Sequence, residues 1–280
     1  MEFAGAGVVV TGAAGGIGEA LARRFHALGS TVVVADVLEK GVRSVADDLE
    51  AIRPDSALAV VADLRSEEGN RRLVETAHEF LSQRGRNGGH ANSGIDLFFA
   101  NAGVGTGSFV ETTPEEDWDL AFDVNIHAHR WAAKYLLPRW LERGNGYFCS
   151  TASAAGLLAQ IGSAPYSVTK HAAVAFAEWM SLTYGDRGVR VSCLCPQGVN
   201  TRMLSGGDIG DSRAGDVVRS AGVVLEPEQV AHIVAEAITA ERFLILPHPE
   251  VHDFETKKTA DRDRWLAGMR KLQRRVFGDL

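Results

Sequence analysis

Short apolar segments alternate with longer amphipathic segments along most of the chain. The apolar segments are rich in β-branched residues and end at Gly, Asp, Asn or Pro, which is typical of buried strands. Between them, segments such as 15–29 and 165–185 repeat their apolar positions at the period of a helix. The segments predicted as strands are 7–12, 31–36, 57–63, 95–103, 146–153, 189–196 and 242–247.

This alternation of strands and helices predicts an α/β fold with a doubly wound, mostly parallel sheet of seven strands (Rossmann-like). Helices should cover both faces of the sheet, and residues 1–248 should form a single domain. Two stretches lack the regular pattern. The Gly- and Asn-rich residues 84–94 are expected to form a surface insertion, and residues 197–225 to form a mobile lid with a substrate loop.

The last part of the chain, residues 249–280, is strongly charged and is expected to be a helical extension. It carries eight Lys or Arg between Lys257 and Arg275, with acidic residues interleaved. Its apolar residues, from Trp265 to Val276, recur at roughly helical spacing. We therefore expect a helix that packs on its own domain or on a neighbouring subunit, rather than an anion-binding tail.

Composition narrows the classes of partner. With 36 acidic and 29 basic residues, the net charge is −7, which argues against binding to a nucleic-acid backbone. The three cysteines make no disulfide framework and fit a reducing compartment. No apolar stretch approaches the roughly 18 residues needed to cross a bilayer, and no secretory signal is recognised. We predict a cytoplasmic protein without a nucleic-acid or membrane partner.

The histidines do not form a recognisable metal site. His127 and His129 are two residues apart, so on a helix their rings point in different directions. His248 and His252 are separated by Pro249 and lack the order of a zinc-binding helix. No Cys/His cluster has zinc spacing. We predict no metal, and we interpret these histidines as surface or packing residues.

Three glycines, Gly12, Gly16 and Gly18, lie where the first predicted strand turns into a helix. Because they lack side chains, backbone N–H groups and the helix N-terminus can approach a diphosphate. Asp36 ends the second strand, where a carboxylate can bind both ribose hydroxyls and repel a 2′-phosphate. No Arg or Lys occupies the loop, and two apolar residues follow the acid. The pattern favours NAD over NADP; the alternative is a purely structural glycine turn.

A tyrosine, Tyr166, precedes Lys170 by four residues, so both side chains lie on one face of a helix. A phenol normally keeps its proton until about pH 10, but a nearby cation favours its phenolate. The pair could therefore supply a base that works near neutral pH. Taken alone, the same spacing also fits a solvated surface pair.

The spacing Thr-Gly-x-x-x-Gly-x-Gly at 11–18, together with Tyr-x-x-x-Lys at 166–170, resembles the short-chain dehydrogenase/reductase family. The resemblance extends from residue 7 to about 247 and includes Asn-Ala-Gly at 101–103. It implies a nicotinamide cofactor and the interconversion of alcohols and ketones. The family's serine precedes the tyrosine by thirteen residues, which selects Ser153 rather than the earlier candidate Ser150.

The resemblance implies a role for each of four catalytic residues. Tyr166 would act as general acid/base, and Lys170 would hold the nicotinamide ribose and lower the pKa of the phenol. Ser153 would hold the substrate oxygen and stabilise its developing charge. Asn125 would hold a water that links Lys170 to solvent.

It also implies contacts along the cofactor. Asp63 would bind the adenine, Gly103 would let the cofactor pass close, and Val199 and Thr201 would contact the nicotinamide amide. Gln197 replaces a glycine that is usual in the family, which leaves the local backbone open. The predicted cofactor-binding set is Gly12, Gly16, Ile17, Gly18, Asp36, Asp63, Leu64, Asn101, Ala102, Gly103, Tyr166, Lys170, Val199 and Thr201.

The substrate pocket is expected where loops leave the carboxyl ends of the strands. The residues at these positions are mostly apolar and uncharged, which predicts a neutral, mostly apolar secondary alcohol or its ketone. They are Val104, Leu157, Leu158, Ile161, Gln197, Met203 and Leu204.

The sequence therefore predicts an NAD-dependent short-chain alcohol dehydrogenase or ketone reductase that forms a homodimer or homotetramer. A catalytically silent NAD-binding sensor or scaffold is the alternative, although the complete Asn-Ser-Tyr-Lys group argues against it. A sugar-nucleotide epimerase or dehydratase is disfavoured, because such relatives carry a different glycine spacing and a larger C-terminal domain.

Overall fold

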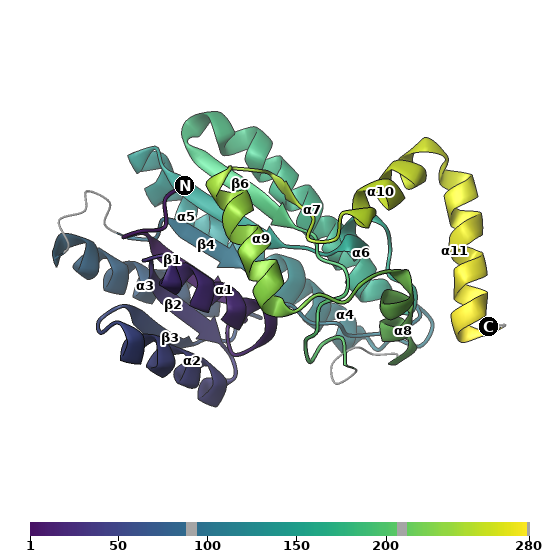
Figure 1. The fold of residues 1–280 in the computed structure, drawn as a ribbon, viewed down its shortest axis with the longest axis horizontal. Helices are drawn as coiled ribbons and strands as arrows, with labels where there is room; N and C mark the ends of the chain where they lie inside the picture. The colour runs from purple at the N-terminus through teal and green to yellow at the C-terminus, as the bar shows by residue number, and fades with distance from the viewer. Residues whose placement is uncertain (88–93, 206–211, 279–280) are drawn as a thin grey trace.

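The computed structural model describes residues 1–87, 94–205 and 212–278. Within these ranges, seven strands form one sheet in the order β3-β2-β1-β4-β5-β6-β7, and every neighbouring pair is parallel (Figure 1). The predicted doubly wound α/β fold is confirmed. The strands are β1 (Gly7–Thr11), β2 (Thr31–Asp36), β3 (Ala57–Val61), β4 (Leu97–Ala100), β5 (Gly146–Thr151), β6 (Val189–Leu194) and β7 (Leu244–Ile245).

Helices cover both faces of the sheet (Figure 1). Val8 and Val10 of β1 pack into the core cluster beneath α1, α2 and α9, whereas Val9 packs into the cluster beneath α3, α5 and α7. Successive residues of a strand point to opposite faces, so both faces of β1 are apolar. The helices are α1 (Gly16–Ala27), α2 (Glu39–Ile52), α3 (Glu67–Asn87), α4 (Glu115–Phe122), α5 (Ala128–Arg143), α6 (Ala154–Leu157), α7 (Ala164–Tyr184), α8 (Ser212–Ala221) and α9 (Pro227–Thr239).

Several strands end earlier than the sequence predicts. β4 ends at residue 100, whereas the prediction extended to 103. Beyond it, Asn101 N–H donates to Thr11 Oγ1 (2.9 Å) and its side-chain Nδ2 donates to Thr11 O (2.9 Å). The polar residues that follow the strands therefore belong to loops at the carboxyl edge of the sheet. That edge is where ligands bind in this type of fold.

The two irregular stretches of the sequence are described only in part. Helix α3 continues to residue 87, so the predicted insertion at 84–94 begins as helix. Residues 88–93 lie outside the described residues, as do 206–211 of the predicted lid. On either side of the second gap, residues 201–205 form turns and residues 212–221 form α8.

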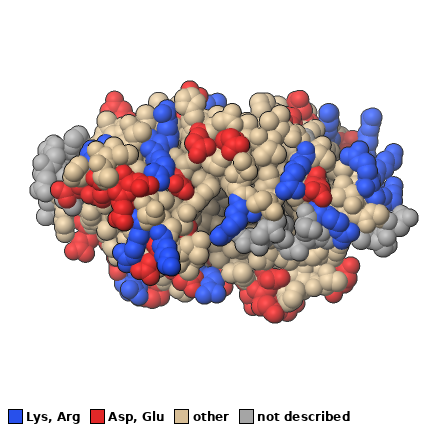
Figure 2. Space-filling model, turned by 60° about the horizontal axis from the view of Figure 1, so that its bottom comes forward, with Lys and Arg blue, Asp and Glu red and all other residues tan. Residues whose placement is uncertain are grey.

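Two further helices, α10 (Glu250–Ala260) and α11 (Arg262–Phe277), follow β7. They stand at one end of the molecule, and the C-terminal part of α11 lies beside α8 (Figure 1). Basic side chains gather at this end of the surface (Figure 2). Among the described helices, none combines the length and the apolar character that a membrane span requires.

Candidate active site

The loop after β1 presents backbone, rather than side chains, at the carboxyl edge of the sheet. Gly12 and Gly16 have φ angles of +66° and +56°, a region that favours glycine. A Cβ atom on Gly18 would lie 2.1 Å from Gly12 O, so the first turn of α1 packs directly on the loop. The N–H groups of a first helical turn have no intrahelical partner. Together with the helix N-terminus they form a cradle suited to a diphosphate.

Asp36 is held in a defined position beside this cradle. Its Oδ2 accepts a hydrogen bond from Ala14 N–H in the glycine loop (3.0 Å), and its Oδ1 accepts one from Leu38 N–H (3.0 Å). The carboxylate thus ties the end of β2 to the loop. A ribose that extends from the diphosphate site would meet it there.

Asp63, the predicted adenine-binding residue, is exposed and already paired with a cation. Arg65 Nη2 lies 2.6 Å from Asp63 Oδ2. The hydrogen bond from the guanidinium holds the pKa of the Asp63 carboxyl below its usual value. An adenine contact at Asp63 would have to share the carboxylate with Arg65, a feature that the motif did not reveal.

Asn125 lies in a π-helical turn, Asp123–His127, between α4 and α5. It is completely buried. Its Oδ1 accepts a hydrogen bond from Val104 N–H (2.9 Å), and its Nδ2 donates to Val104 O and Thr169 Oγ1 (3.0 Å each). Both amide protons are therefore used. Single π-helical turns inside α-helices are frequent at functional sites, and this one connects the loop after β4 to the helix that carries Tyr166 and Lys170.

Lys170 is 2% exposed, and its Nζ donates to Thr151 O at the end of β5 (2.9 Å). Burial lowers its pKa to about 8. A Cβ atom on Gly103 would lie 3.2 Å from both Lys170 Nζ and Asn125 Oδ1. The glycine therefore keeps open the narrow space between the two catalytic candidates.

Tyr166 is near both Ser153 and Lys170. Lys170 Nζ is 5.6 Å from the centroid of the phenol ring. Burial raises the pKa of Tyr166, while the neighbouring Ser153 hydroxyl lowers it by a smaller amount. The lysine directs its hydrogen bond to a backbone carbonyl, Thr151 O, and its lowering of the phenol's pKa stays a prediction.

Ser153 is placed by backbone contacts just beyond β5. It is buried, its Oγ accepts a hydrogen bond from Ala155 N–H (3.1 Å), and it caps the short helix α6. The competing candidate Ser150 lies within β5, where its Oγ is 3.0 Å from His129 Nδ1 in the core. The structure thus brings Ser153, not Ser150, to Tyr166.

Residues 197–201 lead from β6 toward the glycine loop. A Cβ atom on Gly16 would lie 3.1 Å from Thr201 Cγ2, so the segment that holds Val199 and Thr201 closes over the cradle. Gln197, the departure from the family pattern, donates its N–H to His248 Nδ1 (3.1 Å). The opposite ring nitrogen of His248 is 3.0 Å from Gly198 O and must carry the proton that it donates.

His248 is buried, which agrees with its interpretation as a packing residue, but its two hydrogen bonds were not foreseen from the sequence. It is 2% exposed and follows β7 within the segment Pro247–Pro249. Burial lowers its pKa, which favours the neutral ring that both contacts need. A histidine between two prolines was the available signal, but its partners lie about fifty residues earlier in the chain.

The predicted substrate-pocket residues occupy different environments. Leu157 and Ile161 are buried, and Leu158, Val104, Met203 and Leu204 are partly buried. Gln197 Oε1 is a buried acceptor without a hydrogen-bond partner among the residues that the structure describes. The predicted set therefore offers mainly apolar surface and one unused polar atom.

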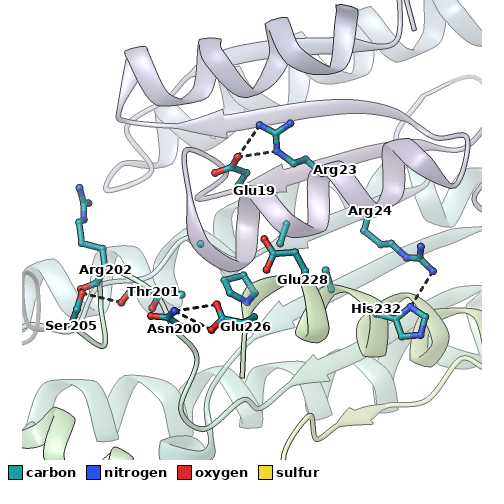
Figure 3. Close-up of a pocket in the computed structure, with 14 residues that line it drawn as sticks. Glu19, Arg23, Arg24, Asn200, Thr201, Arg202, Ser205, Glu226, Glu228 and His232 are labelled. Atoms are coloured by element: carbon teal, nitrogen blue, oxygen red, sulfur yellow. Dashed lines mark hydrogen bonds and ion pairs between the residues drawn. The ribbon is translucent and has the colours of Figure 1, made fainter. Parts of the chain in front are cut away.

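A cavity of about 750 Å³ opens between α1, α9 and residues 200–205 (Figure 3). It reaches Gly16 of the glycine loop and Thr201 of the segment after β6, but none of Ser153, Tyr166 and Lys170 lines it. Its outer part is crossed by polar contacts, such as Arg23 with Glu19 (2.9 Å) and Asn200 with Glu226 (3.1 Å). The cavity therefore flanks the cradle from outside and is not the reaction centre.

No group of three or more His, Cys, Asp or Glu side chains within residues 1–87, 94–205 and 212–278 is arranged to hold a metal ion. The polar groups described at this sheet edge are the serine, the phenol and the ammonium group. Each of them lies at, or just beyond, the carboxyl end of β5 or on the helix packed against it.

A dinucleotide cradle and a Ser-Tyr-Lys group at the same edge of a doubly wound sheet define a nucleotide-binding oxidoreductase. The chain belongs to the short chain dehydrogenase family, whose profile matches residues 6–208. It is 37% identical over 245 residues to 1-deoxy-11-beta-hydroxypentalenate dehydrogenase of Streptomyces exfoliatus, covering 86% of this chain and 82% of the relative.

Two other proteins extend this comparison. The chain is 34% identical over 237 residues to meso-2,3-butanediol dehydrogenase of Serratia marcescens, covering 84% of this chain and 88% of that protein. A short chain dehydrogenase/reductase from Burkholderia phymatum, solved in complex with NAD, superposes with a TM-score of 0.82 at 28% identity, over 94% of this chain and 96% of that one. An oxidoreductase that acts on alcohol- or ketone-type substrates is therefore supported.

Proposed function

We propose that this protein is an NAD(H)-dependent dehydrogenase that interconverts a neutral, mostly apolar secondary alcohol and its ketone. The observation that carries the proposal is the meeting of Tyr166 with Ser153 and Lys170 beside the glycine cradle. The cradle suits a dinucleotide, because Gly18 lets the first turn of α1 pack directly on the glycine loop and Gly103 leaves a narrow space beside Lys170 and Asn125. Bound NAD would supply the hydride acceptor in its nicotinamide ring.

Tyr166 takes the hydroxyl proton of the alcohol, and Ser153 donates a hydrogen bond to the same oxygen as charge develops on it. The proton must leave a phenol whose pKa is raised by burial, so a nearby positive charge is needed. Lys170 supplies this charge at neutral pH, because its pKa of about 8 leaves it mostly protonated. In ketone reduction the same phenol gives its proton back.

Asn125 lies where it could hold a water on the proton path between Lys170 and solvent. Both Nδ2 protons are used on Val104 O and Thr169 Oγ1. A water that links Lys170 to solvent would therefore donate to Asn125 Oδ1 or to a backbone carbonyl of the π-helical turn. The same hydrogen bonds fix the spacing between the loop after β4 and α7.

Preference for NAD is proposed from the position of Asp36. Two backbone N–H groups hold its carboxylate at the end of β2, and the two residues that follow it are exposed and uncharged. A 2′-phosphate placed there would meet a negative charge without a basic partner in the loop. The NAD in the Burkholderia structure is consistent with this preference.

The neutral character of the substrate is proposed from the uncharged pocket residues. The Serratia relative is named for a neutral diol, whereas the Streptomyces relative is named for a hydroxylated carboxylate. The two names therefore support the alcohol class but leave the charge open. A panel of neutral and carboxylated secondary alcohols, assayed with NAD, separates the two. A higher kcat/KM for carboxylated members would contradict the neutral assignment.

The central experiment replaces Tyr166 with Phe, which removes the acid/base group and keeps the ring. We expect kcat for alcohol oxidation to fall by about 10³-fold, while the Kd for NADH, measured by fluorescence titration, changes by less than about twofold. Retained turnover in the variant would refute Tyr166 as the base. Tight NADH binding with no turnover of any alcohol by the unmodified protein would favour the sensor or scaffold alternative.

A further inference from the structure

The C-terminal helices α10 and α11 contact the segment that joins Ser153 to Tyr166. This connection, residues 154–163, contains α6 and the turn that leads into α7. It sets the distance between the two residues that would hold the substrate oxygen. The family profile matches residues 6–208, and the contacting helices follow that range.

The first contact is made by Lys258 of α10, which is only 8% exposed. Its Nζ donates to Leu157 O, to Leu158 O (2.8 Å) and to His171 Nε2 (3.3 Å). His171 Nδ1 lies 2.8 Å from Ser167 O and donates its proton there, which leaves Nε2 as an acceptor. All three ammonium protons are therefore used.

These bonds join the end of α6 to α7 at the residue after Lys170. Carbonyl groups at the end of a helix lack intrahelical partners, and a cation there is favourable. Burial lowers the pKa of Lys258, so its charged form depends on the three acceptors around it. The buried Lys258 therefore joins α10 to the end of α6 and to α7 through defined hydrogen bonds, whereas its neighbour Lys257 is exposed.

The second contact is made by Phe277 at the end of α11. Gly162 has a φ angle of +83°, and a Cβ atom there would lie 2.6 Å from Phe277 Cζ. The ring also packs edge-on against Phe109 (5.7 Å between centroids) and joins a cluster with Ile161 and Val217. Phe277 thus meets the loop after β4, the connection and helix α8 of the predicted lid.

We propose that the C-terminal extension completes the substrate side of the active site, with Lys258 as a positioning residue for the connection and Phe277 as the anchor that ties it to α8. Lys258 touches no reacting atom; it acts through the carbonyls of Leu157 and Leu158 and so through the placement of Ser153. Phe277 supplies apolar packing that holds three pocket-forming segments together. This inference rests on the proposed function for its catalytic meaning, but its structural content does not depend on turnover.

The structural content is tested by hydrogen exchange in the protein without substrate. The amides of Gly156 and Leu158 donate to Ser153 O and Ala154 O, and the amide of Gln160 donates to Ser167 Oγ. Lys258→Met should accelerate exchange of peptides that cover residues 154–162 by about tenfold, whereas Lys257→Met should leave it unchanged. Lys258→Arg, which keeps the charge and several donors, should restore part of the protection. Equal exchange in the two Met variants would overturn the proposal.

The catalytic content is tested with the same variants. For the best alcohol of the panel, Lys258→Met should lower kcat/KM by about tenfold or more, with the Kd for NADH within about twofold of the unmodified value. Phe277→Ala should raise KM more than it lowers kcat, and Leu266→Ala, at an exposed position of the same helix, serves as its control. Unchanged kinetics in both Lys258→Met and Phe277→Ala would overturn the proposed role of the C-terminal extension in the active site.

The two failures are distinguishable. If the unmodified protein oxidises no alcohol while exchange in the connection still responds to Lys258, the proposed function fails and the positioning contact stands. If the unmodified protein is active and exchange does not distinguish Lys258 from Lys257, the further inference fails and the proposed function stands. A uniform increase of exchange over the whole chain in Lys258→Met marks general destabilisation and counts against a local positioning role.

Discussion

Two regions at this edge of the sheet differ in what shapes them: the nucleotide side, which is the glycine loop 12–18, and the catalytic side around Ser153, Tyr166 and Lys170. The nucleotide side depends on missing atoms: Gly12 and Gly18 leave room for backbone to meet backbone. The catalytic side depends on buried ionisable groups, since Lys170, His129 and Lys258 are all 8% exposed or less. The first arrangement is governed by steric fit and should respond little to pH. The second is governed by desolvation and should respond strongly.

The largest expected effect tests the steric side of this comparison. A Cβ atom on Gly18 would lie 2.1 Å from Gly12 O, closer than any real contact. Gly18→Ala must therefore push α1 away from the loop and open the diphosphate cradle. We expect the Kd for NADH to rise by about 100-fold, the scale of about 3 kcal/mol of lost binding, as measured by fluorescence titration.

The neighbouring Gly15 supplies the matched control. A Cβ atom there meets nothing within 4 Å, and its φ angle of 174° is open to any residue. Gly15→Ala should leave the Kd for NADH within about twofold. Similar losses in both variants would show that flexibility of the loop, rather than the close approach at Gly18, governs binding.

The next effect tests the ionisable side through stability. Burial, assisted by the charge of Lys170, lowers the pKa of His129 to about 3. An unfolded chain binds this proton near pH 6.5, whereas the folded protein does not. The neutral, buried His129 therefore contributes fully to the free energy of unfolding above pH 6.5, and this contribution is lost as the pH falls toward 3. Between pH 7 and pH 5 we expect it to lower the free energy of unfolding by about 2 kcal/mol.

His129→Asn removes the titration and keeps a polar group near Ser150. Urea unfolding of both proteins at pH 7 and pH 5 isolates the effect, because the remaining histidines are common to both. The variant is expected to lose less stability on acidification than the unmodified protein. An equal loss in the two proteins would mean that His129 is hydrated or protonated in the folded state.

The two sides also differ in how far their residues were predictable. The glycines, Asp36 and the Tyr166–Lys170 pair lie in short motifs whose spacing is fixed by a turn or by one helical repeat. Lys258 belongs to no short motif, and the two prolines beside His248 do not reveal its contacts, because the partners lie about a hundred and about fifty residues away. The surroundings of Tyr166 were hidden for the same reason: a sequence displays the neighbouring lysine but not the burial that raises the pKa of the phenol.

A smaller effect is expected for the charge of Asp36. Asp36→Ala removes the carboxylate that would repel a 2′-phosphate, so the ratio of kcat/KM for NAD to that for NADP should fall by about tenfold. Asp36→Asn separates charge from hydrogen bonding, since an amide oxygen can still accept from Ala14 or Leu38 N–H. An unchanged ratio in both variants would place the cofactor discrimination elsewhere.

The smallest expected effect is on cofactor binding after replacement of His248, which holds the segment between the catalytic side and the nucleotide side. Its ring joins Gln197 N–H to Gly198 O and so holds the segment that brings Thr201 to Gly16. His248→Leu removes both bonds without touching the Ser153–Tyr166 pair, so KM for NAD should rise by about fivefold with kcat nearly constant. His252→Leu, at an exposed position of α10, is the control. A fall in kcat with unchanged KM would instead assign the His248 segment to the catalytic side, because loss of transition-state stabilisation alone has that signature.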